Sequence, residues 1–238
     1  MSAATDASTE SWQRFKRVSH DIEGWFTDAA SCASDAMLRF QSEIGVQGDL
    51  FEIGAWHGKS ASLWLVHCRK TETVHIIDFE CREPLGQNVN RIAADLGVKV
   101  NLTKNTSFRF PDSNFLSQHR RSMRLIHIDG DHSGPGISND LNVCADMLSL
   151  FGVMIVDDFL NPRFPQISEA VFGFLADRRR DFSMFACGAN KAFICTAKGY
   201  DRWGEFAKAR LGEEIRAQIP GLATFDGSCE NRPVLGLR

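Results

Sequence analysis

The sequence predicts an α/β fold with a Rossmann-like, seven-stranded, mostly parallel sheet, an antiparallel C-terminal hairpin and helices on both faces. Short apolar runs alternate with helical stripes through the middle of the chain, and a glycine turn follows the first of these runs. Two strand-like runs separated by Cys-Gly-Ala-Asn follow near the end. Strands separated by helices imply right-handed crossovers, and therefore a parallel sheet that is covered on both faces.

Helix and strand signals can be placed in order along the chain. The start of the chain is small, polar and acidic and looks disordered. A helix is expected from Ala29 to Gly45, because Thr27 and Asp28 can cap it and its apolar residues follow helical spacing. The parallel strands are expected at Asp49–Ile53, Val74–Ile77, Val98–Leu102, Leu125–Ile128 and Val153–Val156.

The C-terminal part departs from this alternation. A helix around Ile167–Leu175 is followed by the hairpin strands Phe182–Ala186 and Lys191–Thr196, and Tyr200–Arg238 looks like a helix with an irregular tail. Because 238 residues with 43% hydrophobic content can form one sizeable core, one folded unit is expected. Its parts are a helical cap (1–47), a Rossmann-like core (48–198) and a C-terminal helix and tail (199–238).

Charge and cysteine usage limit the classes of partner. The net charge of -3 gives no field that would gather nucleic acid or an anionic membrane, so a small-molecule partner is expected. The seven cysteines include no C-x-x-C pair and read as reduced thiols. Without a basic apolar leader or a run of roughly 18 apolar residues, the sequence favours a cytoplasmic protein. A homo-oligomer is compatible with the sequence.

The glycine turn Gly54-Ala55-Trp56-His57-Gly58-Lys59-Ser60 leads from the first strand into a helix. Such a turn presents backbone N–H groups and a positive helix end at the carboxyl edge of the sheet, where α/β folds bind ligands. Gly58-Lys59-Ser60 resembles the end of a phosphate-binding P-loop, but that loop needs four residues between its glycines and this turn has three. The spacing therefore argues against a nucleotide hydrolase.

Asp78 ends the second strand. A carboxylate at this point can accept hydrogen bonds from both hydroxyls of a ribose, as the equivalent acid does in Rossmann folds generally. The alternative is an ordinary strand-end aspartate that stabilises a turn. A nucleoside-containing cofactor is the interpretation that the glycine turn favours.

Carboxylates and one histidine follow the fourth and fifth strands. The fourth strand ends in Asp129-Gly130-Asp131-His132 and the fifth in Asp157-Asp158. Clustered carboxylates without compensating cations repel one another, so a hard divalent ion is the natural counter-charge, and oxygen ligands favour magnesium, calcium or manganese over zinc. Each aspartate alone could be a turn or cap residue. The other histidines, including His57, His67 and His75, form no evident ligand pattern.

These motifs resemble those of class I S-adenosylmethionine-dependent methyltransferases. The run Glu52–Ala61 is similar to the first motif of catechol O-methyltransferase-like enzymes. Asp129-Gly130-Asp131 with Asp157-Asp158 is closer to the macrocin and novobiocin sugar O-methyltransferases. The resemblance extends over roughly Gly48–Ala197 in order and spacing. It also suits a parallel sheet closed by an antiparallel hairpin.

The resemblance implies roles for individual residues. The implied cofactor contacts are Glu52, Gly54, Ser60, Asp78, Ser107 and Asp129. The implied metal ligands are Asp129, Asp157 and Asp158. Asp131 would be the general base by analogy with the sugar-methylating enzymes, whereas the catechol-type enzymes have a lysine where this chain has His132. Asp131 and His132 therefore both stay open as the base.

The expected function is O-methylation of a small-molecule hydroxyl on a sugar, phenol or natural product, with S-adenosylmethionine and Mg²⁺ (or Mn²⁺). Trp25 and Phe26 are candidates for a lid over the pocket, although core packing is the alternative for at least one of them. Two other classes of function are compatible with the fold. One is a cephalosporin hydroxylase-like oxidative enzyme, and the other is a cofactor-binding protein without catalysis.

Overall fold

The computed structural model describes residues 3–109 and 114–238 and contains one mixed sheet. Its strands are β1 (Asp49–Ile53), β2 (Thr73–Asp78), β3 (Lys99–Lys104), β4 (Met123–Ile128), β5 (Leu148–Asp157), β6 (Phe182–Gly188), β7 (Lys191–Thr196), β8 (Thr224–Cys229) and β9 (Arg232–Leu237). Their spatial order is β3-β2-β1-β4-β5-β7-β6-β9-β8. Strands β1 to β5 pair in parallel, whereas β7 is antiparallel to both β5 and β6. The α/β fold with a mostly parallel sheet and an antiparallel C-terminal hairpin is confirmed.

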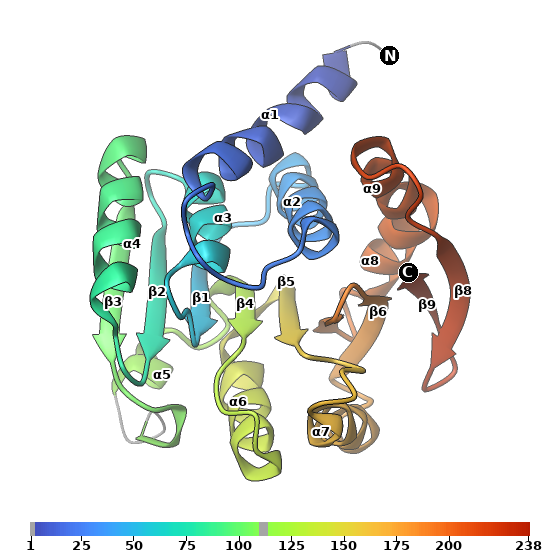
Figure 1. Cartoon of the computed structure of the whole chain (residues 1–238). Coiled ribbons are helices and arrows are strands. Elements are labelled where there is room, and N and C mark those ends of the chain that lie inside the picture. Colours follow the sequence, from blue (N-terminus) through green and yellow to red (C-terminus); the bar gives the residue numbers. More distant parts are fainter. Residues whose placement is uncertain (1–2, 110–113) are drawn as a thin grey trace.

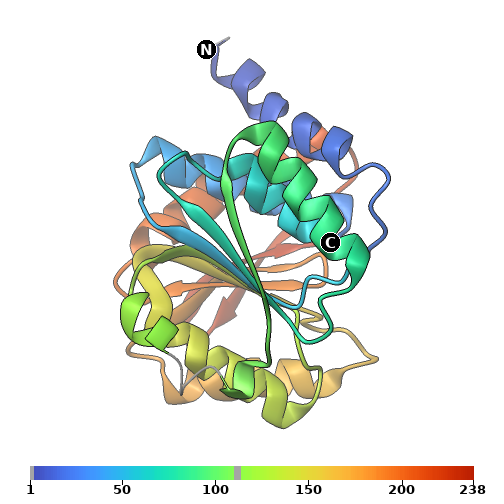
Figure 2. The ribbon, with the colours of Figure 1, turned by 90° about the vertical axis from the view of Figure 1, so that its left-hand side faces the viewer.

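Helices cover both faces of the sheet (Figures 1 and 2). They are α1 (Ala3–Val18), α2 (Asp28–Glu43), α3 (Lys59–His67), α4 (Glu83–Leu96), α5 (Asn114–Gln118), α6 (Gly134–Met147), α7 (Pro165–Asp177), α8 (Tyr200–Phe206) and α9 (Gly212–Gln218), with a 3₁₀ turn η1 (Ser107–Arg109) and a π turn η2 (Ala207–Leu211). In Figure 2 the sheet lies between α1–α4 on one side and α6–α7 on the other. The buried apolar residues accordingly form two clusters, one under each helical layer.

The first expected helix forms as its capping residues predict. The hydroxyl of Thr27 accepts a hydrogen bond from the Ala30 N–H at 3.2 Å, which satisfies a helix donor that otherwise has no partner. Residues on α2 such as Met37 and Leu38 are buried in the core beneath it. This helix anchors the N-terminal segment across one face of the sheet.

Two parts of the chain differ from expectation. The start contains a helix, α1, rather than a disordered segment. The expected irregular tail contains β8 and β9, and β9 pairs in parallel with β6, so that the sheet has nine strands instead of seven (Figure 1). The hairpin was missed because β8 is mostly exposed and has no apolar alternation, whereas only β9 buries apolar side chains.

No helix among the described residues is long and apolar enough to cross a membrane.

Candidate active site

A cavity of about 1240 Å³ opens at the carboxyl ends of β1, β2, β4 and β5. Its wall includes Gly54, Asp78, Asp129 and Asp157, each of which stands at or just after the end of one of these strands. Parallel strands place their carboxyl ends at one edge of the sheet, and this edge is where ligands bind in open α/β folds. The predicted cofactor and acidic sites therefore share one cavity.

The glycine turn needs glycine at its first position. Gly54 has φ of 75°, and a Cβ built there would lie 1.9 Å from the Asp129 carbonyl oxygen. The Gly54 N–H donates to the Ile77 carbonyl at 2.8 Å, which fixes the turn against β2. A larger residue at position 54 would therefore clash with the backbone of the segment that follows β4.

Asp78 lies in the cavity wall and already holds the neighbouring loops. One carboxylate oxygen accepts from the Ala55 N–H at 3.0 Å, and the other accepts from the Glu80 and Cys81 N–H groups at 2.9 and 2.8 Å. A carboxylate has about four lone-pair positions, so capacity remains for a ribose hydroxyl. Asp78 is both a loop anchor and a candidate ligand.

Glu52 and Ser60 lie behind the glycine turn and do not line the cavity. They bond to each other, with the Ser60 hydroxyl donating to Glu52 Oε1 at 2.6 Å, and His127 Nδ1 lies 2.7 Å from the same oxygen. Alternation along β1 explains this, because Phe51 and Ile53 face the α6 side and Glu52 therefore faces α3. Glu52 and Ser60 therefore influence the cavity only indirectly, through the glycine turn that they support.

Ser107 lines the cavity and hydrogen-bonds to Asp140 of α6, a buried carboxyl that was not among the predicted site residues. Asp140 Oδ2 has no hydrogen-bond partner among the described residues, and it would lie 2.8 Å from a Cβ built on Gly130. Burial raises the pKa of Asp140 to about 6. Its helical position, with apolar neighbours at Ile137 and Leu141, was the available signal that it is buried.

Asp140→Asn is expected to stabilise the protein at pH 8 by on the order of 2 kcal/mol and to do so much less at pH 4 to 5. Because the folded-state pKa lies above the unfolded value, the folded state holds this proton more tightly, and stability falls as pH rises from about 4 through about 6. The neutral amide removes that loss. Melting temperatures of both proteins across this range test the difference, and an equal gain at every pH would contradict it.

The acidic cluster forms at the ends of β4 and β5 as the topology predicts. His132 Nε2 lies 3.5 Å from Asp129 Oδ1 and 3.5 Å from Asp158 Oδ2, so the imidazole bridges the two strand ends. The Asp158 N–H donates to Asp157 Oδ1 at 2.7 Å. Donor atoms of Asp129, His132 and Asp158 lie within 4.8 Å of one another, as do those of His127, Asp129 and Asp157.

Two residues of β7 and its turn complete the cluster, and sequence analysis did not select them. The Lys191 ammonium forms an ion pair with Asp157 Oδ2 although only 2% of the residue is exposed. The Asn190 side-chain amide donates to Asp158 Oδ1 at 2.7 Å and reaches Asp157 Oδ1 at 3.2 Å. The signal was the antiparallel hairpin, since its register places Lys191 opposite Asp157.

The carboxylates of the cluster differ in acidity. Burial and the charge of Asp157 raise the pKa of Asp129. Burial alone would also raise the pKa of Asp157, but Lys191 and then His127 outweigh it and lower that pKa. Asp157 is therefore the carboxylate that stays ionised, and Asp129 is the one that resists ionisation without a nearby cation.

The donor set can accommodate a hard divalent ion. Lys191 compensates the charge of one of the three carboxylates, that of Asp157. The sequence-based expectation that these carboxylates have no compensating cation was therefore wrong. Negative charge nevertheless remains in excess at Asp129 and Asp158. Asp129 and Asp158 keep oxygens directed at the gap that His132 bridges. Both oxygens of Asp157 already have partners, so Asp157 has less capacity left for an ion than Asp129 and Asp158 have.

The two candidate bases are in different environments. Asp131 is exposed, and both of its oxygens accept hydrogen bonds from Ser133, from the N–H and from the hydroxyl, at 2.9 Å each. His132 is half-buried, packs its ring 4.3 Å from that of Phe164, and has its pKa raised by its contact with Asp129. Both line the cavity.

Aromatic side chains form the mouth of the cavity. Trp25 is 81% exposed, and its ring lies 5.7 Å from that of Trp56. The Arg82 guanidinium lies 3.5 Å from the centre of the Trp56 ring. Phe26 also lines the cavity but is buried against Phe15 and Trp64, so it packs in the core.

Comparison with known proteins agrees with this geometry. Residues 51–159 match the family model described as a methyltransferase domain. CalS11, a TDP-rhamnose 3'-O-methyltransferase of calicheamicin biosynthesis, superposes with a TM-score of 0.55 at 14% identity, over 79% of this chain and 93% of CalS11. No curated protein sequence matches this chain.

Two further solved structures share the fold. MycE, a methyltransferase of the mycinamycin pathway in complex with Mg and SAH, gives a TM-score of 0.56 at 15% identity, over 81% of this chain and 55% of MycE. The SAH-bound Podospora anserina methyltransferase PaMTH1 gives 0.51 at 16% identity, over 80% of this chain and 88% of PaMTH1. Residues 51–159 therefore match a methyltransferase domain, and the chain shares the fold of these solved methyltransferases.

Proposed function

We propose that this chain transfers the methyl group of S-adenosylmethionine to a hydroxyl oxygen of a small molecule, with Mg²⁺ or Mn²⁺ held by Asp129, Asp157 and Asp158. The observation that carries the proposal is that one cavity contains both Asp78 and the acidic cluster. Asp78 and the glycine turn would hold the nucleoside, and the cluster would face the acceptor. A protein that only binds the cofactor has no need for the second group.

The sulfonium methyl is already an activated electrophile, so the main task of the protein is to position the methyl donor and the acceptor hydroxyl. A divalent ion bound at the cluster would lower the pKa of an acceptor hydroxyl. Asp131 or His132 would take the proton. Of the two, His132 is better supported, because its ring nitrogen faces the carboxylates of Asp129 and Asp158. Both oxygens of Asp131, in contrast, accept hydrogen bonds from Ser133. The Lys191 ammonium would keep Asp157 ionised and in place.

The aromatic mouth favours acceptors with an apolar or planar part. Trp25, Phe79 and Phe108 are all exposed beside the cavity. Such rings offer large contact areas at little conformational cost. CalS11 acts on a TDP-linked sugar and MycE serves a mycinamycin pathway, and we propose an acceptor of the same broad kind, a sugar or phenol hydroxyl on a larger scaffold.

The oxidative alternative receives no support from the cavity. A two-histidine, one-carboxylate iron site needs three such donors around one point. The described donors that gather in the cavity wall are mainly carboxylates, with His132 as the histidine among them. The described group that has two histidines and one carboxylate lies elsewhere in the fold.

Asp78→Ala is expected to weaken binding of S-adenosylmethionine or its demethylated product about ten- to a hundredfold. A hydrogen bond to a carboxylate contributes roughly 1.5 to 3 kcal/mol, and about 1.4 kcal/mol is tenfold in affinity. Calorimetry measures the effect, with ATP as a ligand that should not bind. Asp78→Asn keeps one acceptor oxygen, which can serve either the Ala55 N–H or the Glu80 and Cys81 N–H groups but not both, so melting temperatures are measured beside the affinities to recognise loss of the loop.

The matched control is Asp226→Ala on the exposed β8, which should bind like the unaltered chain. Unchanged cofactor affinity in Asp78→Ala would remove Asp78 from the site. Tight ATP binding would instead favour a nucleotide-binding role for the glycine turn.

A further inference from the structure

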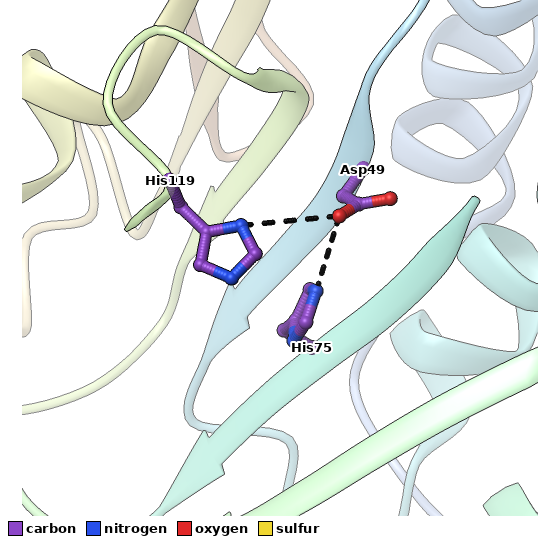
Figure 3. Close-up of side chains that lie close together, drawn as sticks. All are labelled: Asp49, His75 and His119. Carbon is purple, nitrogen blue, oxygen red and sulfur yellow. Dashed lines mark hydrogen bonds and ion pairs between the residues drawn. The ribbon is translucent and has the colours of Figure 1, made fainter. Parts of the chain in front are cut away.

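Asp49, His75 and His119 lie together at the amino ends of β1 and β2, at the opposite edge of the sheet from the cavity (Figure 3). Asp49 is the first residue of β1, His75 is the third residue of β2, and His119 follows α5. Register explains the first two: Phe51 pairs with His75, and alternation turns Asp49, Phe51 and His75 to the same face. The sequence shows no ligand pattern around His75, because His119 comes from a distant segment.

The three side chains converge on one carboxylate oxygen. Asp49 Oδ2 lies 3.3 Å from His75 Nε2 and 3.9 Å from His119 Nδ1, and Figure 3 shows both rings directed at it. The three donor atoms all lie within 4.8 Å of one another. Tetrahedral zinc with bonds of about 2.0 to 2.2 Å places its ligand atoms roughly 3.3 to 3.5 Å apart. The distance from Asp49 Oδ2 to His75 Nε2 already has this spacing, and the distance to His119 Nδ1 exceeds it by about 0.4 Å.

The surroundings hold the carboxylate and one imidazole in position. Asp49 Oδ1 accepts a hydrogen bond from the Thr73 N–H at 2.9 Å, which leaves Oδ2 directed at the histidines. His75 is buried, and its ring packs edge-on to that of Phe115 at 5.1 Å and lies 4.8 Å from that of His119. Burial also lowers the pKa of His75, which favours the neutral ring that binds metals.

We propose that Asp49, His75 and His119 bind one Zn²⁺ ion, with water in the fourth position. Two imidazoles and a carboxylate are a zinc ligand set, whereas the oxygen-rich cluster of the cavity suits harder ions. The ion would fasten the end of α5 to β1 and β2.

The site is tested by zinc binding and does not depend on the proposed methyl transfer. Calorimetry with Zn²⁺ on the reduced full chain should show a zinc ion that His119→Ala binds at least about tenfold more weakly, because one of three protein ligands is lost. Zinc should also raise the melting temperature of the unaltered chain, and this shift should be lost in His119→Ala.

His20→Ala is the matched control, since His20 is a histidine whose side chain is 83% exposed and lies outside both groups. His20→Ala and His119→Ala both keep every cysteine and the acidic cluster, so zinc bound at those residues contributes equally to the two variants. Asp49→Asn should behave like His119→Ala while retaining an acceptor for the Thr73 N–H. If Asp49→Asn fails to fold, His119→Ala decides alone, because His119 is half-buried at the surface.

Equal zinc affinity, stoichiometry and thermal shift in the unaltered chain, His119→Ala and His20→Ala would overturn the proposal. Loss of the zinc response in His119→Ala alone would establish it. Retention of zinc in His119→Ala but loss in a variant of the acidic cluster would place the ion in the cavity instead, and would also overturn it.

Discussion

Chelation of divalent ions is expected to abolish methyl transfer and to leave binding of the cofactor largely intact. In the proposed mechanism the ion would serve the acceptor hydroxyl at Asp129 and Asp158, whereas Asp78, which lines the same cavity, would serve the nucleoside. Loss of an ion that polarises a reacting oxygen removes several kcal/mol of barrier lowering, so a fall of at least about a hundredfold in rate is expected. Transfer to acceptors found in a panel of sugar and phenol hydroxyls measures the rate, and calorimetry measures the cofactor.

Asp158→Ala should reproduce the chelated state. Asp158 has φ of 56°, a conformation that aspartate and asparagine tolerate better than alanine, so Asp158→Asn tests the charge without the added backbone strain. Mg²⁺ or Mn²⁺ should raise the melting temperature of the unaltered chain by several degrees at saturating concentration, and of either variant much less. Zinc should give a smaller shift through the acidic cluster than these ions do.

The control for the chelation experiment is to add metal ions back one at a time after the chelator is removed. Mg²⁺ alone should restore the rate, because the proposed zinc site at the other edge of the sheet is not part of the reaction. Asp226→Asn should behave like the unaltered chain, since Asp226 is an exposed residue of β8. Full activity in a metal-stripped sample with chelator present would contradict the metal mechanism and would make His132 the leading candidate for a metal-free base.

The sequence predicted the parallel strands because burial on both faces leaves a continuous apolar run. β1 was predicted with its observed bounds, Asp49–Ile53, and β7 likewise, Lys191–Thr196. The edge strand β8 carries no such signal, because it exposes Phe225 and Asp226 alike and nothing in its pattern separates it from a loop. Position in the sheet does not by itself decide which strands are recognised, since the edge strand β3 was predicted whereas β9, which lies between β6 and β8, was missed.

Within the candidate site, contacts that topology alone sets could be predicted, and contacts that depend on register or packing could not. Residues at strand ends, such as Asp78 and Asp129, could be predicted to share a cavity because parallel topology alone brings them to one edge. Lys191 enters from an antiparallel strand, and its contact with Asp157 depends on a register that only pairing sets. Asp140 and His119 come from helices or their ends, where the side chain that meets a neighbour depends on packing rather than on topology.

His132→Gln is expected to lower the rate of methyl transfer by about a hundred- to ten-thousandfold, which is the range that a positioned general base contributes. Asp131→Asn should lower it by less than about tenfold, because Asp131 is exposed and both of its oxygens are engaged by Ser133. His132 Nε2 lies 3.5 Å from carboxylates of both strand ends, so its ring nitrogen stands beside the residues proposed to hold the ion and the acceptor hydroxyl.

The dependence of the rate on pH distinguishes a base from a residue that only supports the cluster. A base must be unprotonated, so the rate should rise with pH through the pKa of His132, which the Asp129 contact raises above its usual value in the metal-free chain. Metal at the same carboxylates opposes that effect and should move the rise to lower pH. In His132→Gln this rise should disappear while cofactor affinity and the Mg²⁺ thermal shift persist. A large loss in Asp131→Asn with the rise retained in His132→Gln would assign the base to Asp131.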